Sequence, residues 1–263
     1  MKTILFILAL SLLMGVIAAT AAQPAAVPPR PAQPATQPAD TLLPDLRSPG
    51  QSMTMVQWVL LLTVLAVAPA IVVMVTSFTR IVVVLGLLRQ ALATQQLPPN
   101  QVLFGLALLM TLVVMSPVIA DVHRDALGPF LDGRLSRDDA FAAAQARVRT
   151  FMIGQVEAAG NTQDVYLFLD ENTAARKDLK WSAVPTLSLI PAYVISELKI
   201  AFYMGFRIFL PFLVVDLLVA SVLTSMGMLM LPPVLVSLPL KLLLFVLADG
   251  WHLVAGTLMQ SFT

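Results

Sequence analysis

Residues 183–251 combine a long apolar run with several charges, and they read AVPTLSLIPAYVISELKIAFYMGFRIFLPFLVVDLLVASVLTSMGMLMLPPVLVSLPLKLLLFVLADGW. The stretch is long enough for two membrane spans, because about 20 apolar residues cross a bilayer. It nevertheless carries the charged residues Glu197, Lys199, Arg207, Asp216, Lys241 and Asp249. A charge facing lipid at mid-bilayer costs about 2.5–3.5 kcal/mol, so we expect these buried charges to face protein, water or one another. The stretch therefore predicts a pathway or an assembly interface.

Residues 183–263 are predicted to form a kinked helical hairpin that turns near residues 227–233. With the turn at Leu229, Asp216 lies 13 residues before it and Lys241 lies 12 after it, while Arg207 and Asp249 lie 22 before and 20 after. These offsets correspond to about 1.5–3 Å along an antiparallel pair of helices. We therefore predict two ion pairs, Asp216 with Lys241 and Arg207 with Asp249. The alternative is that the charges sit at helix ends or extend to water.

Three methionines alternate at this predicted turn: Met226, Met228 and Met230. Methionine is flexible and polarizable, so a ring of such loops would seal a pore and still deform around different substrates. We therefore predict that they form a channel gasket. The alternative is that they fill gaps in ordinary packing.

The whole composition is that of an all-α integral membrane protein. Of the 263 residues, 58% are hydrophobic and 12% are charged, against about 25% charged in soluble domains. The net charge of +1 provides no basic face for nucleic acid. The absence of cysteine excludes disulfides and thiolate metal sites.

Enzyme activity is not expected. The sequence has neither a phosphate-binding GxxxxGK[ST] loop nor a Gly-x-Ser-x-Gly elbow. His123 and His252 stand far apart without clustered ligands, so we predict no catalytic metal and no cofactor.

The N-terminal residues predict export of the mature N-terminus to the periplasm. Residues 1–22 combine Lys2, an apolar core over residues 4–17 and small residues at a cleavage site, as in a signal peptide. An uncleaved first span is the alternative. Residues 23–52 form a Pro/Ala-rich linker, which is too poor in large apolar residues to bury a core.

Residues 53–120 are predicted to form an N-terminal membrane-type helical hairpin. Residues 56–88 would make a helix of about 50 Å, which exceeds a hydrocarbon core of about 30 Å, so we expect a kink or break at Pro69 or at residues 76–80. Residues 102–120 form a cleaner span. The short connection between the two carries Arg89 and no acidic residue, which favours a cytoplasmic position.

Residues 121–182 are predicted to be a soluble helical region. Ser136 and Asp139 have the spacing of a capping box at the start of a helix. The apolar residues that follow recur at helical spacing up to Gly154, and they are Phe141, Ala144, Val148, Phe151 and Met152. The amphipathic helix packs either on its own protein or on a neighbouring copy.

Several ordered motifs carry a family resemblance. They are TSFTRIVVVLGLLRQAL at residues 76–92, PPNQVL at 98–103, SELK at 196–199, LPP at 231–233 and DGW at 249–251. Together they resemble the FliP/SctR family of type III secretion export gate proteins over most of residues 56–262. Thr79, Arg80, Gln101 and the signal peptide are more similar to the flagellar branch than to its injectisome counterpart.

The resemblance implies a subunit of the flagellar type III protein export gate in the bacterial inner membrane, at the flagellar basal body. Such a subunit forms a homo-oligomeric helical ring with FliQ and FliR, has FlhB and FlhA nearby, and passes unfolded flagellar proteins. The resemblance also places the gasket at Met226, Met228 and Met230. The alternatives are a solute transporter that uses the buried charges as an ion relay, a structural scaffold, and the injectisome counterpart of the gate.

Overall fold

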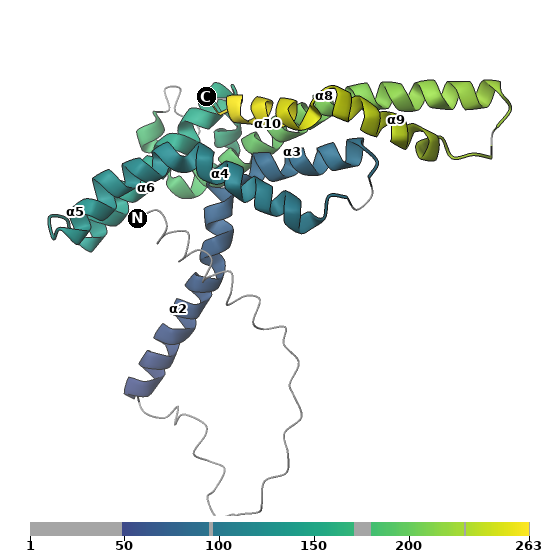
Figure 1. Ribbon diagram of the computed structural model, residues 1–263. Helices are drawn as coiled ribbons and strands as arrows, with labels where there is room; N and C mark the ends of the chain where they lie inside the picture. The colour runs from purple at the N-terminus through teal and green to yellow at the C-terminus, as the bar shows by residue number, and fades with distance from the viewer. Residues whose placement is uncertain (1–48, 95–96, 171–179, 229, 263) are drawn as a thin grey trace, which may run out of the picture. The chain divides into compact units, whose positions relative to one another are not determined.

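The computed structural model of the chain describes residues 49–94, 97–170, 180–228 and 230–262 (Figure 1). The predicted signal peptide and residues 23–48 of the linker lie outside these ranges. The chain divides into two units, residues 1–57 and residues 58–263. The described residues are mostly helical and contain no strand, which confirms the predicted all-α class.

The first long helix breaks where the sequence predicts. Helix α2 (Pro49–Met74) ends just before the polar residues 76–80, and α3 (Phe78–Ala91) begins within them. Pro69, the other candidate position, lies inside α2 and does not end it. The Tyr193 hydroxyl donates a hydrogen bond of 2.9 Å to the Thr76 carbonyl at the break. Because a carbonyl freed from a helix needs a donor when water is absent, this contact makes the break tolerable.

The next helix runs beyond residue 120, where the predicted hairpin ended. Helix α4 (Asn100–Val122) continues through a π-helical turn, η3 (His123–Leu127), into α5 (Gly128–Leu131). Asp121, Arg124 and Asp125, which were expected in a soluble region, are therefore part of a continuous helix. Asp125 in this turn pairs with Arg147 at 2.6 Å and joins the turn to the following helix.

Helix α6 (Arg137–Ala158) begins at the predicted cap. The Ser136 hydroxyl accepts a hydrogen bond of 3.2 Å from the Asp139 N–H, and the helix continues through Gly154. Its C-terminal half packs on the same protein, since Met152 is buried against the start of the following long helix. Phe141 is 71% exposed, so the N-terminal half keeps an uncovered apolar residue.

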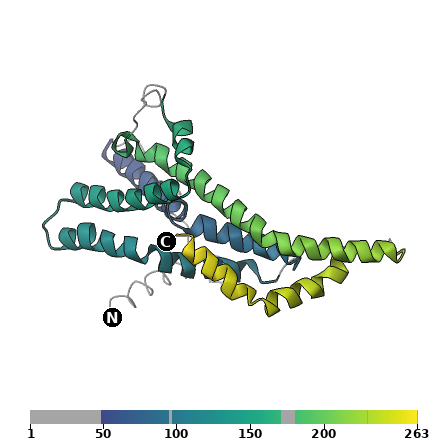
Figure 2. The same cartoon turned by 90° about the horizontal axis from the view of Figure 1, so that it is seen from above.

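The C-terminal part is a helical hairpin with a bent second arm. Two short 3₁₀ segments, η4 (Thr162–Phe168) and η5 (Trp181–Ala183), lead to the 40-residue α8 (Thr186–Ser225). Helix α9 (Pro233–Leu247) returns beside α8 and bends by 64° into α10 (Gly250–Gln260) (Figures 1 and 2). The turn therefore lies between Ser225 and Pro233, close to the predicted residues 227–233.

Three of these helices are long and apolar enough to cross a membrane, or four if α9 and α10 count as one span. The buried core has two parts. One joins α3, α4, α8 and α10 around residues such as Ile81, Leu88 and Leu258. The other joins α6, η4 and the beginning of α8 around Met152 and Tyr193. The α8–α9 arm beyond this core carries most of the predicted site residues.

Candidate functional site

The most buried charges in the described residues form an ion pair between α3 and α8. Arg80 is 1% exposed and Glu197 is 0% exposed. The Arg80 Nε and Nη2 atoms donate hydrogen bonds of 2.8 and 2.6 Å to the two carboxylate oxygens of Glu197. This two-bond geometry is the strongest way for a guanidinium to hold a carboxylate. Glu197 therefore faces protein, but its partner Arg80 is not one of the six charged residues of 183–251.

The remaining donors of Arg80 hold two further elements. Its Nη1 atom donates to the Ser261 carbonyl at 2.7 Å and to the Ser261 hydroxyl at 3.0 Å, and its Nη2 atom donates to Gln155 Oε1 at 2.9 Å. The guanidinium also stacks over the Phe262 ring at 3.9 Å. The Arg80 cluster, meaning Arg80, Gln155, Glu197, Ser261 and Phe262, thus joins α3, α6, α8 and the end of α10.

This role of Arg80 was not predicted from the sequence. A signal for it was present, because Arg80 is the single charged residue in residues 56–88. A lone arginine inside so long an apolar run needs a buried partner. The sequence does not say which carboxylate supplies it.

The predicted pair of Asp216 and Lys241 is present between α8 and α9. Lys241 Nζ lies 2.6 Å from Asp216 Oδ2, and the Ser237 hydroxyl donates to Asp216 Oδ1 at 2.6 Å. Lys241 also donates to the Ala91 carbonyl, at 3.2 Å. Because that carbonyl belongs to the last turn of α3, Lys241 caps the end of α3 while it pairs with Asp216. The hairpin is thereby tied to the core.

Lys199 is paired but not buried, which corrects the expectation for this residue. Its side chain is 53% exposed, and its Nζ atom lies 2.5 Å from Oδ1 of the buried Asp164. Asp164 belongs to η4, which packs on α8. The 3₁₀ segment thus brings a carboxylate from outside the hairpin to the lysine.

The predicted intramolecular pair of Arg207 and Asp249 is wrong. Arg207 is exposed, and its guanidinium lies over the Tyr203 ring at 4.5 Å. Arg207 precedes Asp216 by nine residues, which is about two and a half turns at 3.6 residues per turn, so the two residues lie on opposite faces of α8. Since Asp216 faces α9, Arg207 faces away from it. Asp249 is exposed at the bend between α9 and α10.

The methionine loop, meaning the described residues 226–228 and 230–232, lies at the far end of the α8–α9 hairpin. Met226, Met228 and Met230 are all exposed, and Met230 is 98% exposed. Gly227 adopts φ +76, a conformation that glycine adopts without strain, and so permits the chain to turn. These three methionines therefore do not pack in the core of their own chain.

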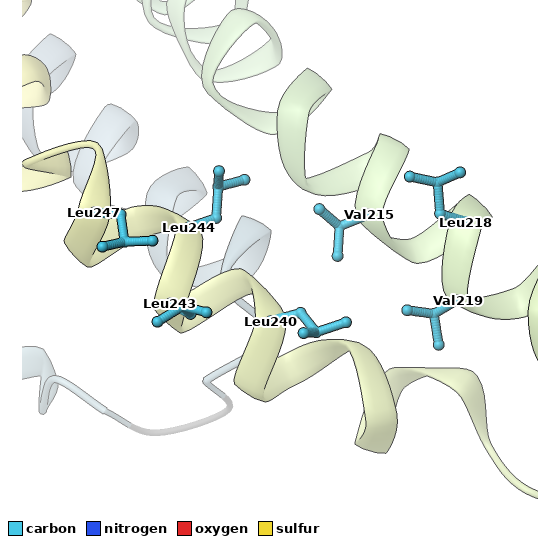
Figure 3. Close-up of a pocket in the computed structure, with 7 residues that line it drawn as sticks. All are labelled: Val215, Leu218, Val219, Leu240, Leu243, Leu244 and Leu247. Atoms are coloured by element: carbon cyan, nitrogen blue, oxygen red, sulfur yellow. The ribbon is translucent and has the colours of Figure 1, made fainter.

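An apolar groove follows the hairpin behind this loop. It has a volume of about 300 Å³ and lies between α8 and α9 (Figure 3). Its lining residues are Val215, Leu218, Val219, Leu240, Leu243, Leu244 and Leu247. Many other large apolar side chains on both helices are exposed, among them Phe202, Phe206 and Val246. Apolar surface on this scale marks contact with lipid or with other proteins.

Apolar helices with ionic ties between them define an all-helical protein of the integral membrane type. A family model described as the FliP family matches residues 61–258, so the chain belongs to the FliP family of flagellar biosynthesis and export proteins.

Curated relatives agree with this assignment. The "Flagellar biosynthetic protein FliP" of Bacillus subtilis is 46% identical over 218 residues, which cover 81% of this chain and 95% of the relative. The protein of the same name from Caulobacter vibrioides is 50% identical over 219 residues, covering 81% and 78%. The one from Pectobacterium carotovorum is 49% identical over 215 residues, covering 81% of each.

Proposed function

We propose that the chain is a non-enzymatic subunit of the flagellar type III protein export gate, in which several copies form a channel with FliQ and FliR. Unfolded flagellar proteins pass through this channel. The observation that carries the proposal is a long apolar hairpin, held to the core at Lys241, that ends in exposed methionines. The family assignment and the flagellar names of the relatives favour the flagellar gate over the injectisome counterpart.

The proposed location is the bacterial inner membrane at the flagellar basal body, with an exported N-terminus and with FlhA and FlhB nearby. The apolar helices support a membrane position. The exposed apolar faces of α8 and α9 support contact with neighbouring subunits, because a helical ring buries such faces between its members.

In this proposal Met226, Met228 and Met230 act as a gasket around the channel. An unbranched thioether side chain changes shape at little cost and packs against many surfaces. A ring of these loops closes around an empty channel and yields to a polypeptide in transit. The exposure of all three side chains is what such a role requires.

Deletion of the gene tests the gate. We expect cells without it to make no flagellar filament and to recover filaments when the gene is returned. Normal filaments in the deletion strain would count against the flagellar assignment.

Replacement of Met226, Met228 and Met230 together by alanine tests the gasket. We expect a larger ion leak through the assembled gate and weaker export of filament protein, because the smaller side chains leave the channel open. Met74→Ala is the matched control, since Met74 is exposed but lies at the end of α2. A triple variant with the leak and export of the control would contradict the gasket.

A further inference from the structure

The outer stripe of α8 is uncovered in the described residues except at Lys199, where Asp164 of η4 lies. We use this name for exposed residues that follow one another at helical spacing, namely Lys199, Tyr203, Arg207, Leu210 and Val214. Phe212, on the other side of the helix, is buried in the core. Lys199 has a partner in Asp164, whereas Arg207 has only the ring of Tyr203. Arg207 therefore presents an uncompensated positive charge on an apolar surface.

One acidic side chain is left over in the same part of the molecule. The described residues of 180–262 contain the carboxylates Glu197, Asp216 and Asp249. Glu197 is paired with Arg80, and Asp216 is paired with Lys241. Asp249 is exposed, and no ion pair holds it within the described part of the chain. It is fixed in position by the bend, where its backbone has φ 49.

Arg207 and Asp249 lie at nearly the same level along the hairpin. The contact between Asp216 and Lys241 provides the reference, since it joins the two helices at 2.6 Å. Arg207 lies nine residues from Asp216 and Asp249 lies eight from Lys241, both away from the methionine loop, so the two levels differ by about 1.5 Å. The face of α8 that carries Arg207 points away from α9. Arg207 and Asp249 therefore do not meet within one hairpin. A second molecule placed beside the hairpin is needed to give each charge a partner.

We propose that Arg207 of one copy forms an ion pair with Asp249 of a second copy of this chain. The matching level allows the pair when two hairpins stand side by side without an axial shift. The contact is heterologous, because the outer stripe of α8 in one copy meets the bend between α9 and α10 in the next. Each charge then gains a partner of opposite sign in a setting where an unpaired charge is costly. The inference rests on the proposed function, in which several copies assemble.

Cross-linking between two differently tagged copies tests the pair directly. The chain has no cysteine, so an introduced cysteine is the only reactive thiol in each copy. One copy carries Arg207→Cys and the other carries Asp249→Cys, and both are expressed together with the remaining gate proteins. A short bis-maleimide is added to membranes, and the product is purified through both tags. The matched control replaces Arg207→Cys by Leu217→Cys, which is also exposed but lies about 15 Å further along α8.

We expect a product with both tags that is several-fold more abundant than in the control. A gate that assembles normally but gives no more product than the control overturns this inference and leaves the proposed function intact. Protein that remains monomeric in a native gel without cross-linker, with the unmodified chain, overturns the proposed function itself. Cross-linking of Arg207→Cys to a different protein in place of the second copy also overturns the inference.

A charge swap guards against an effect of the cysteines on folding. Arg207→Glu and Asp249→Lys should each reduce the yield of the assembled gate several-fold, because each places two like charges together. The double variant should recover most of that yield. Failure of the double variant to exceed both single variants would contradict the pair.

Discussion

Replacement of Glu197 by glutamine measures how strongly the Arg80 cluster stabilises the fold. Arg80 and Glu197 are 1% and 0% exposed and share two hydrogen bonds of 2.8 and 2.6 Å. Glutamine keeps the shape of the side chain but removes its charge, so the guanidinium stays buried beside a neutral amide. Breaking a buried pair from one side costs about 3–5 kcal/mol. We expect Glu197→Gln to lower the free energy of unfolding by this amount.

The double variant Arg80→Met with Glu197→Leu separates the charge effect from loss of packing. Removing both charges at similar volume is often nearly neutral, because neither group is left buried alone. The Ser261 carbonyl, however, loses its 2.7 Å hydrogen bond from Arg80. An acceptor left without a donor costs about 1–3 kcal/mol. We therefore expect the double variant to lose about 1–3 kcal/mol, which is less than the loss from Glu197→Gln alone.

Both losses can be measured by titration of purified protein with dodecyl sulfate in mixed micelles, followed by the fluorescence of the three tryptophans. Asp132→Asn is the control, because Asp132 and its partner Arg134 are 59% and 68% exposed. An exposed pair contributes at most about 1 kcal/mol. If Glu197→Gln costs no more than Asp132→Asn, or if the double variant is less stable than Glu197→Gln, the buried charge pair does not stabilise the fold in the way described.

Two further changes test the hairpin. Asp216→Lys places two cations together at the centre of the hairpin and should reduce assembly of the gate in a native gel. The double variant Asp216→Lys with Lys241→Asp should restore assembly. If the double variant does not recover assembly, the pairing is contradicted. Gly250→Ala should lower the thermal midpoint of unfolding in detergent, because the added Cβ lies 2.2 Å from the Phe245 ring. Gly256→Ala, whose Cβ meets nothing within 4 Å, should not lower it, and equal effects of the two changes would argue against this packing.

Features that depend on neighbours in the sequence could be predicted. The break after α2 follows because the apolar run is too long for one membrane span and is interrupted by the polar residues 76–80. The cap of α6 follows from the spacing of Ser136 and Asp139. The pair of Asp216 and Lys241 follows from their nearly equal distances to a turn marked by glycine and proline. Each of these needs only the rise of a helix and the position of one loop.

Features that depend on direction around a helix or on distant segments could not be predicted in the same way. The level of Arg207 matches that of Asp249, but the rotation about α8 places Arg207 on the wrong face for an intramolecular pair. The carboxylate partner of Arg80 is 117 residues away, and the other contacts of Arg80 come from α6 and the end of α10. Counting residues along one hairpin therefore predicts the level of a side chain along the helix axis. The partner of that side chain depends on which helices pack together.

Helix α3 connects the two ionic sites and limits where the hairpin can move. Arg80 in its first turn contacts Glu197 of α8, and the carbonyl of Ala91 in its last turn accepts a hydrogen bond from Lys241 of α9. These ties are 11 residues apart, which is about 16 Å along α3. Between them Gly205 lies so close to Leu87 that a Cβ there would be 2.1 Å from the leucine side chain. The base of the hairpin is thus held along the whole length of α3. Beyond the contact of Lys241 with α3, no such contact reaches the methionine loop in the described residues. If the loop moves while the core stays intact, the movement is therefore confined to residues 216–241.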